Sequence, residues 1–163
     1  MKQLIVIRHA KSSWDLPLRD YDRPLTNKGI QNAHLVSNNI SSIIPKNVLV
    51  WSSAAKRASE TAIIFAQNIS YPVDSIIFKE ELYTFDENKL EEIIKSCPDV
   101  YEHLIVFGHN EAITNFVNKF GSAFIDNVST CGFVNIIFEQ KSWQNIKNGT
   151  TKNVIFPSNL KSV

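Results

Sequence analysis

Short, continuous apolar runs alternate along most of the chain with stretches of helical periodicity. The clearest runs cover residues 4–7, 48–51 and 104–107, with a weaker one at 75–78. Each is only a few residues long and built from β-branched or large apolar side chains, as expected for strands that are buried on both faces. We therefore predict four strands from these runs.

Between and after these runs, apolar residues recur at the spacing of one helical face. The pattern predicts helices after Thr26, after Ser52 or Ser53, over about 88–96 and after residue 110. Hydroxyl side chains favour helix N-termini, so Thr26 and one of the two serines are predicted to be N-caps. The apolar positions are Ile30, Ala33, Val36 and Ile40 in the first helix, Ala58, Ala62, Phe65 and Ala66 in the second, and Ile113, Phe116, Val117 and Phe120 in the last.

Alternating strands and helices indicate an α/β fold, a three-layer sandwich in which a mostly parallel central sheet carries helices on both faces. Two further strands, over 133–138 and 154–156, are predicted at a sheet edge, with a turn at 148–149. The length of 163 residues fits one domain, and no repeat or linker divides the chain. Residues 1–163 are therefore predicted to form a single domain.

Composition excludes several classes of protein. Hydrophobic residues make up 44% and charged residues 20% of the chain, with a net charge of +1, so it is neither disordered nor strongly basic. The scattered tryptophans lack a basic stripe and are interpreted as packing residues, and no nucleic-acid partner is expected. Cys97 and Cys131 match no metal or redox spacing and are predicted to be buried apolar residues. The first apolar run ends at Arg8, too early for a signal peptide or a membrane span, so we expect a cytoplasmic protein that binds no membrane. Nothing in the sequence demands a dimer, and a monomer is expected.

Chemically active side chains follow the three clearest strands. Arg8 and His9 end the first, Arg57 comes soon after the second, and His109 follows the last. The carboxyl ends of parallel strands meet at one edge of a sheet, where α/β proteins bind ligands. The chain has only four arginines and four histidines, so two of each at this edge predict a common site.

These residue types fit a phosphate site. Guanidinium groups bind several phosphoryl oxygens at once, and a helix N-terminus adds backbone donors. Arg8, Arg57 and the helix after Ser53 would supply them. A neutral imidazole can use its lone pair as a nucleophile without a separate base. His9 follows Arg8 on the same tight turn, so we assign the attack to His9 and charge neutralisation to His109.

The ordered motifs resemble those of the histidine phosphatase superfamily, specifically its SixA-like phosphohistidine phosphatase branch. They run through residues 8–15 (RHAKSSWD), 20–26 (DYDRPLT) with Gly29, 52–58 (SSAAKRA) with Thr61 and Ala62, 81–83 (ELY) and 108–110 (GHN). An Arg-His pair alone is weak, whereas the ordered set spans most of the chain. The resemblance implies a phosphoglycerate mutase-like fold and a two-step phosphoryl transfer through a phosphohistidine on His9, with no metal or other cofactor.

The resemblance also implies roles for neighbouring residues. The phosphoryl oxygens would be surrounded by Arg8, Arg57 and His109, with further contacts from Lys11, Ser12 and Arg23 at the rim. Many superfamily members place a carboxylic acid shortly after the third strand to protonate the leaving oxygen. Thr84 stands where that acid is expected, which leaves Glu81 as the candidate proton donor.

The missing acid bears on the substrate. An alkoxide leaves poorly without a proton, whereas the imidazole of a phosphohistidine can already carry one, so a P–N substrate is favoured over an alkyl phosphate. The short chain has little room for insertions that enclose small substrates, which suits a phosphohistidine on a signalling or carrier protein. The alternatives are a small-molecule phosphomonoesterase, a phosphoglycerate-mutase-type transferase and a non-catalytic phosphate-binding module.

Overall fold

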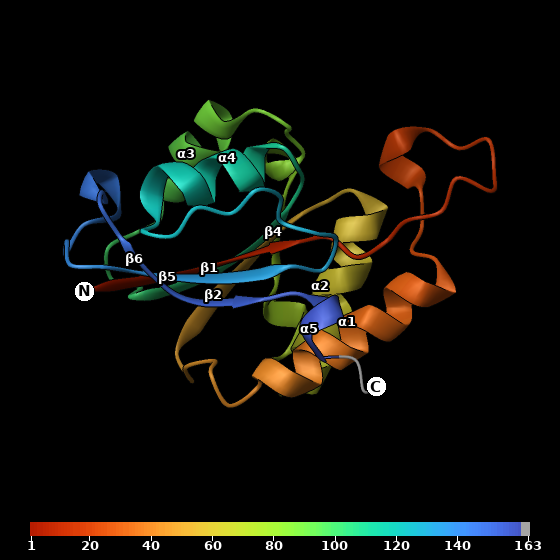
Figure 1. The fold of residues 1–163 in the computed structure, drawn as a ribbon, viewed down its shortest axis with the longest axis horizontal. Helices are drawn as coiled ribbons and strands as arrows, with labels where there is room; N and C mark the ends of the chain where they lie inside the picture. The colour runs from red at the N-terminus through yellow and green to blue at the C-terminus, as the bar shows by residue number, and fades with distance from the viewer. Residues whose placement is uncertain (161–163) are drawn as a thin grey trace.

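A six-stranded sheet with the strand order β3-β2-β4-β1-β5-β6 forms the centre of the computed structural model, which describes residues 1–160 (Figure 1). β1, β2, β3 and β4 run parallel to one another, whereas β5 runs antiparallel to both β1 and β6. The prediction of a mostly parallel sheet is thus confirmed. The strands are β1 (Lys2–Arg8), β2 (Val48–Ser53), β3 (Ile77–Lys79), β4 (His103–Gly108), β5 (Phe133–Phe138) and β6 (Thr150–Ile155).

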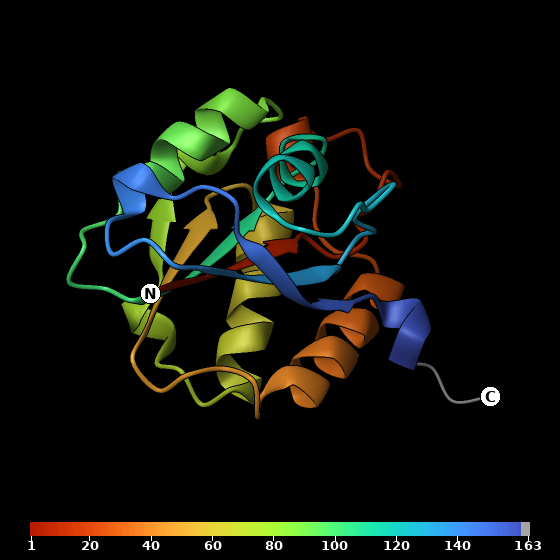
Figure 2. The same cartoon turned by 60° about the vertical axis from the view of Figure 1, so that its left-hand side comes forward.

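Helices cover both faces of this sheet, which completes the predicted three layers (Figure 2). On one face lie α1 (Asn27–Ile40) and α2 (Lys56–Asn68), with the short α5 (Pro157–Leu160) against α1. On the other lie α3 (Glu87–Lys95) and α4 (Ala112–Phe120). No helix within residues 1–160 is long and apolar enough to cross a bilayer.

The alternation of side chains along β1 divides the core in two. Leu4 and Val6 pack into the cluster beneath α3 and α4, whereas Ile5 and Ile7 pack into the cluster beneath α1 and α2. Successive residues of a strand point to opposite faces, so an uninterrupted apolar run is what a strand buried on both sides requires. Both clusters consist of apolar side chains, which leaves the carboxyl ends of the strands as the place for polar chemistry.

The N-cap predicted for α1 is present, whereas the one predicted for α2 is not. Thr26 caps α1 as predicted, with its Oγ1 accepting a hydrogen bond from the Gly29 N–H at 3.0 Å. The prediction that Ser52 or Ser53 caps α2 is wrong, because Ala55 is the N-cap. The Ser53 hydroxyl instead accepts a hydrogen bond from the N–H of this N-cap residue at 3.2 Å. Ile30 is 39% exposed, so the apolar face of α1 begins one turn later than its pattern indicates.

The C-terminal strands also differ from expectation. β5 is an inner strand bonded on both sides, and only β6 lies at the edge. Asn148 has φ of 49°, which fits the turn predicted at 148–149, but the full connection between the strands extends over 139–149 and includes a 3-10 turn.

The tryptophans and cysteines give a mixed result. Cys97 and Cys131 are buried as predicted. Trp51 and Trp143 pack in the core beneath α3 and α4, but Trp14 is 76% exposed. The packing interpretation is therefore wrong for Trp14, which lies on the segment between β1 and α1.

Candidate active site

The carboxyl ends of β1, β2 and β4 lie side by side, because β4 is bonded to both of the others. Arg8, the last residue of β1, pairs with Gly108, the last residue of β4. His9 and His109 follow these two strands, and their ring centroids are 5.3 Å apart. The structure thus brings together side chains that are a hundred positions apart in the sequence.

His9 is nearly buried, and its ring is held in one orientation. Its Nδ1 lies 2.7 Å from the backbone carbonyl oxygen of Ala10, which can only accept a hydrogen bond. Nδ1 therefore carries the ring proton, and Nε2 keeps its lone pair beside Arg57, whose Nε is 3.3 Å away. The turn is fixed by Thr61 of α2, whose Oγ1 accepts from the Ala10 N–H at 3.0 Å.

The surroundings of His9 keep its ring neutral. Burial, together with the positive charges of Arg57, Arg8 and Arg23, lowers the pKa of His9 to about 4. At pH 7 Nε2 is therefore unprotonated without help from a separate base, and its lone pair accepts the hydrogen bond from the Arg57 Nε–H. The arrangement is that of a neutral nitrogen nucleophile surrounded by cations.

Arg57 lies in the first turn of α2 and is almost fully buried. Its Nη1 donates to the backbone carbonyl of Asp20 at 2.6 Å, and its Nη2 pairs with the Asp20 carboxylate at 2.9 Å. The same carboxylate accepts from Arg23 at 3.0 Å and from the Tyr83 hydroxyl. One carboxylate thus positions two guanidinium groups of the site.

Asp20 is unsuited to donating a proton. Burial alone would raise the pKa of its carboxyl, but hydrogen bonds from Tyr83, Arg57 and Arg23 outweigh burial and hold the pKa well below its usual range. The pair of Asp20 with Arg23 joins residues three positions apart, whereas the contact with Arg57 joins residues 37 positions apart and has no local signal in the sequence.

His109 lies behind the wall of the pocket. It is 1% exposed and packs edge-on against Tyr83 and Phe85, with ring centroids 5.2 and 5.6 Å away. Its Nε2 lies 2.8 Å from the Ser53 hydroxyl, while its Nδ1 has no hydrogen-bond partner among the described residues. Burial, followed by the neighbouring ring of His9, lowers the pKa of His109 to about 2. Charge neutralisation by His109 would therefore require the ring to take up a proton when an anion binds.

An open pocket of about 340 Å³ lies at His9. The predicted contact residues Lys11, Ser12 and Arg23 all line it. Glu81 does not: it is exposed on the 3-10 turn η3 (Glu80–Leu82) and outside the lining, so the structure gives no support for it as a proton donor. Lining residues that the sequence reasoning missed are Trp14, Asp20, Phe85, Asn110 and Thr130.

Positive charge dominates this lining. Arg8, Lys11, Arg23 and Arg57 face the pocket together with one carboxylate, that of Asp20. Arg8 is anchored by a hydrogen bond from its Nη1 to a backbone carbonyl at 2.9 Å. Within residues 1–160, no three His, Cys, Asp or Glu side chains are grouped as a metal site would require. The lining thus carries an excess of positive charge from guanidinium and ammonium groups.

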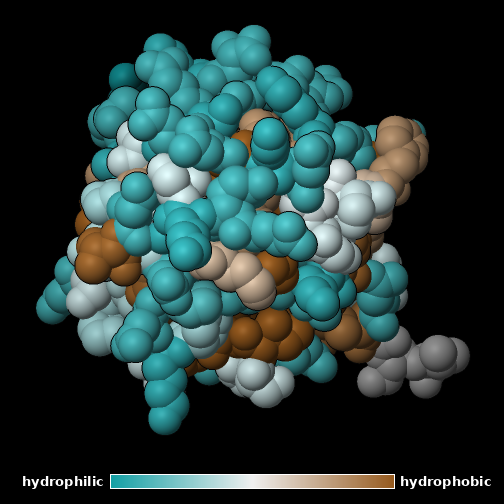
Figure 3. Space-filling view, turned by 90° about the vertical axis from the view of Figure 1, so that its left-hand side faces the viewer, coloured by the Kyte–Doolittle hydropathy of each residue, from teal (hydrophilic) through white to brown (hydrophobic). Residues whose placement is uncertain are grey.

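A larger hollow of about 570 Å³ lies at the other end of the parallel strands, where Val48 and His103 begin β2 and β4. Figure 3 shows this end of the molecule, which is largely hydrophilic with separate apolar patches. It contains none of the residues around His9. The larger of the two hollows is therefore not the one at His9.

The sequence model of the histidine phosphatase superfamily (branch 1) matches residues 4–109. The chain therefore belongs to the histidine phosphatase superfamily. An uncharacterised chloroplastic protein of Arabidopsis thaliana is 31% identical over 153 residues, which cover 88% of this chain and 69% of that protein. An uncharacterised protein of Mycobacterium tuberculosis is 32% identical over 103 residues, 63% of this chain and 62% of that protein.

Solved structures share the whole fold. The protein histidine phosphatase SixA in complex with tungstate aligns with a TM-score of 0.82 at 20% identity, covering 98% of this chain and 99% of SixA. The SixA protein of Nakamurella multipartitia also gives 0.82 at 20% identity, covering 96% of each chain. A mycobacterial glucosyl-3-phosphoglycerate phosphatase gives 0.67 at 11% identity, covering 94% of this chain and 98% of that one. The predicted α/β sandwich and its likeness to SixA are thereby confirmed.

Proposed function

We propose that this protein is a phosphatase that takes the phosphoryl group of a protein-bound phosphohistidine onto Nε2 of His9 and then passes it to water. The observation that carries the proposal is the hydrogen bond between His9 Nδ1 and the Ala10 carbonyl. This bond fixes the tautomer and leaves Nε2 unprotonated, with its lone pair accepting from the Arg57 Nε–H at 3.3 Å.

The first step exchanges one P–N bond for another. The lone pair of His9 Nε2 forms a bond to phosphorus while the bond to the substrate's imidazole breaks and its electron pair returns to the departing ring. Arg8 and Arg57 stabilise the charge spread over the phosphoryl oxygens during the transfer. Lys11, Ser12 and Arg23 add contacts from the rim of the pocket.

The second step restores the enzyme. A water oxygen attacks phosphorus, the P–Nε2 bond breaks, and its electron pair returns to the His9 ring. Inorganic phosphate leaves as dihydrogen phosphate with the water's oxygen and both of its protons, and the His9 ring is again neutral. The guanidinium groups supply the positive charge for both steps, so the scheme requires no metal ion.

The absence of a carboxylic acid that could donate a proton among the lining residues favours a P–N substrate. Asp20 is held as a carboxylate, and Glu81 lies outside the pocket. An alkyl phosphate would have to release a basic alkoxide without a donated proton, whereas an imidazole that carries a proton on its other nitrogen leaves as a neutral ring.

Phosphate release measured from a phosphohistidine-bearing protein and from an alkyl phosphate tests the proposal. Wild type should act faster on phosphohistidine, and a folded His9→Ala variant should be inactive on both. His34→Ala, which removes an exposed histidine of α1, is the matched control and should keep full activity.

Each alternative has a distinct result. Hydrolysis of the alkyl phosphate alone would identify a small-molecule phosphomonoesterase. A labelled phosphoenzyme that returns its label to a mutase substrate would identify a transferase. Binding of inorganic phosphate with no turnover of either compound would identify a phosphate-binding module.

A further inference from the structure

The segment between β1 and α1 leaves the body of the molecule through a narrow neck. Ser12 forms a β-bridge with Leu25, and the Ser13 N–H donates to the Pro24 carbonyl at 2.8 Å. Figure 1 shows the segment, coloured red, standing away from the three layers at the right of the view. We call residues 14–18 the tip of this segment.

The tip exposes large apolar side chains. Trp14 is 76% exposed, Leu16 61% and Leu18 43%. The tip is also held in shape, since the Leu18 N–H donates to the Leu16 carbonyl at 2.8 Å. Single exposed apolar residues are common, but three within five positions of a projecting loop are typical of a contact surface.

The tip continues directly into the pocket. Trp14 lines the pocket, and its ring lies over the guanidinium of Arg23 at 3.5 Å. Arg23 is in turn fixed by Asp20 and by the Ser12 hydroxyl at 2.7 Å. Any molecule that places a phosphoryl group at His9 therefore passes beside the tip.

The rest of the tip lies beyond the reach of a small substrate. Neither Leu16 nor Leu18 lines the pocket of about 340 Å³. A compound confined to that volume would leave both leucines in water, whereas a protein surface around a phosphorylated side chain would cover them.

We propose that Trp14, Leu16 and Leu18 form the docking surface for the protein that carries the phosphohistidine, by packing against apolar side chains next to the phosphorylated residue. This inference rests on the proposed function, because it assumes a substrate larger than the pocket. It assigns binding of the carrier to the tip and the chemistry to the pocket.

The carboxylates at and near the tip favour a protein partner over an anionic lipid surface. Asp15 stands in the middle of the tip, and placing its carboxylate in a bilayer is unfavourable. Glu80 and Glu81 lie nearby, since the Tyr21 hydroxyl, on the segment below the tip, donates to Glu80 at 2.7 Å. These carboxylates repel anionic lipid but can pair with basic side chains of a protein.

Two synthetic peptides test the docking surface, both phosphorylated on one histidine and otherwise identical, with leucines flanking that histidine in one and serines in the other. Wild type should show a KM at least fivefold lower for the leucine-flanked peptide. A Leu16→Ser, Leu18→Ser double variant should lose this preference and keep its rate on phosphoramidate, which is too small to reach the tip.

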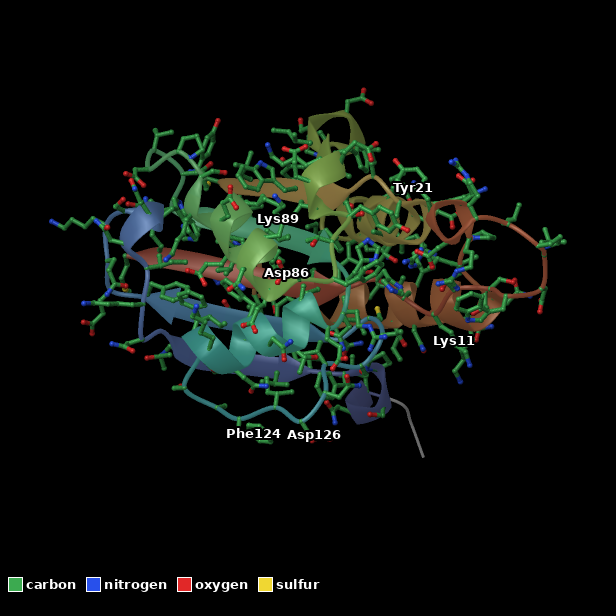
Figure 4. The ribbon with its side chains drawn as sticks, turned by 90° about the horizontal axis from the view of Figure 1, so that it is seen from above. Lys11, Tyr21, Asp86, Lys89, Phe124 and Asp126 are labelled. Carbon is green, nitrogen blue, oxygen red and sulfur yellow. The ribbon has the colours of Figure 1, made fainter. Side chains whose placement is uncertain are left out.

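Phe124→Ser is the matched control, because Phe124 is 83% exposed and lies on another side of the molecule from Lys11 and Tyr21 (Figure 4). This variant should keep the preference. Equal KM values of wild type for the two peptides would overturn the docking surface, and so would an equal loss of rate on phosphoramidate in the double variant. Binding of wild type to phosphatidylserine vesicles that the double variant loses would replace the protein partner with a membrane.

Failure of the proposed function is a separate result. If wild type hydrolyses neither peptide nor phosphoramidate, the phosphatase proposal falls. The docking surface is then decided by titrating wild type and the double variant with the two peptides, where tighter binding of the leucine-flanked peptide to wild type alone would sustain it and equal binding would refute it.

Discussion

The guanidinium of Arg57 holds two oxygens of Asp20 at once, the backbone carbonyl at 2.6 Å and the side-chain carboxylate at 2.9 Å. The first contact fixes the loop on α2, and the second fixes the direction of the guanidinium. A negative group thus stands inside a pocket that we propose binds an anion. The Asp20 carboxylate positions the Arg57 guanidinium, and this matters because a guanidinium misplaced by about 1 Å can lower a rate by about 10²-fold.

Asp20→Ala should therefore lower kcat by roughly 100-fold while the affinity for inorganic phosphate stays equal or rises, since a repulsive charge is removed. Asp20→Asn should recover part of the rate, because its amide oxygen can still accept from Arg57. Steady-state kinetics and phosphate titration measure both effects. Asp22→Ala breaks an exposed pair with Arg19 and serves as the control. An unchanged kcat in Asp20→Ala would exclude the positioning role.

The pH dependence of activity follows from the pKa of His9, which is lowered to about 4. The neutral ring is the nucleophile, so kcat/KM should fall as pH drops through about 4 and not through the usual histidine value of about 6.5. Measurements with phosphoramidate between pH 4 and 8 would reveal the midpoint, after correction for acid hydrolysis of the substrate. A midpoint near 6.5 would mean that His9 is better solvated than its burial indicates.

Stability should depend on pH with the sign that belongs to buried neutral histidines. The pKa values of His9 and His109 are lowered in the folded protein to about 4 and about 2, so below pH 6.5 the unfolded chain binds protons that the folded chain does not. The contribution of the two rings to the free energy of unfolding is complete above pH 6.5. It decreases as pH falls, by on the order of 2 kcal/mol for each ring between pH 7 and 5. Urea denaturation of wild type and His9→Ala at the two pH values measures it. A pH dependence that His9→Ala leaves unchanged would contradict the assignment.

The hydroxyl of Ser53 is expected to act through His109, whose Nε2 it contacts at 2.8 Å. Ser53→Ala should lower kcat by about fivefold with little change in KM, the scale of one hydrogen bond of about 1 kcal/mol. In a His109→Ala background the same substitution should have no further effect, because the ring that it orients is gone. Additive losses in the double variant would show that Ser53 acts independently of His109.

Gly29→Ala should destabilise the protein, although alanine is the better helix former by about 1 kcal/mol. A Cβ at this position would overlap with the backbone carbonyl oxygen of Lys11, and α1 would have to move away from the catalytic turn. We expect a loss of roughly 1–3 kcal/mol in unfolding free energy, as for overpacked sites, and lower activity. Lys28→Ala, at the exposed neighbouring position, should cause neither loss. A Gly29→Ala variant as stable as wild type would show that the turn adapts.

Much of the fold could be predicted because it depends on local patterns of apolar residues along the sequence. A continuous apolar run such as that of Leu4 to Ile7 suits only an element buried on both faces, and parallel strands necessarily bring their carboxyl ends together. The positions of Arg8, His9 and His109 at one edge follow from these two rules. The same reasoning could not reach the parts of the site that depend on irregular segments.

Asp20 and Phe85 illustrate the limit. Asp20 reaches Arg57 only because the loop folds back over α2, and Phe85 reaches the pocket from the segment between β3 and α3. No periodicity governs either segment. Glu81 was chosen for its residue type and its place after the third strand, but the 3-10 turn leaves it exposed and outside the pocket. The sequence predicts Ser52 or Ser53 as the cap of α2, and only the register between β2 and β4 brings the Ser53 hydroxyl to His109.

The neck at Ser12 and Leu25 has an evolutionary consequence. Its bridge lies between the tip and the turn that carries His9, and residues 15–18 contribute nothing to the lining of the pocket. Substitutions in those four positions can alter shape and polarity without moving the nucleophile. Under the proposed docking, a handful of substitutions in one loop would change the recognised partner and leave the reaction unchanged.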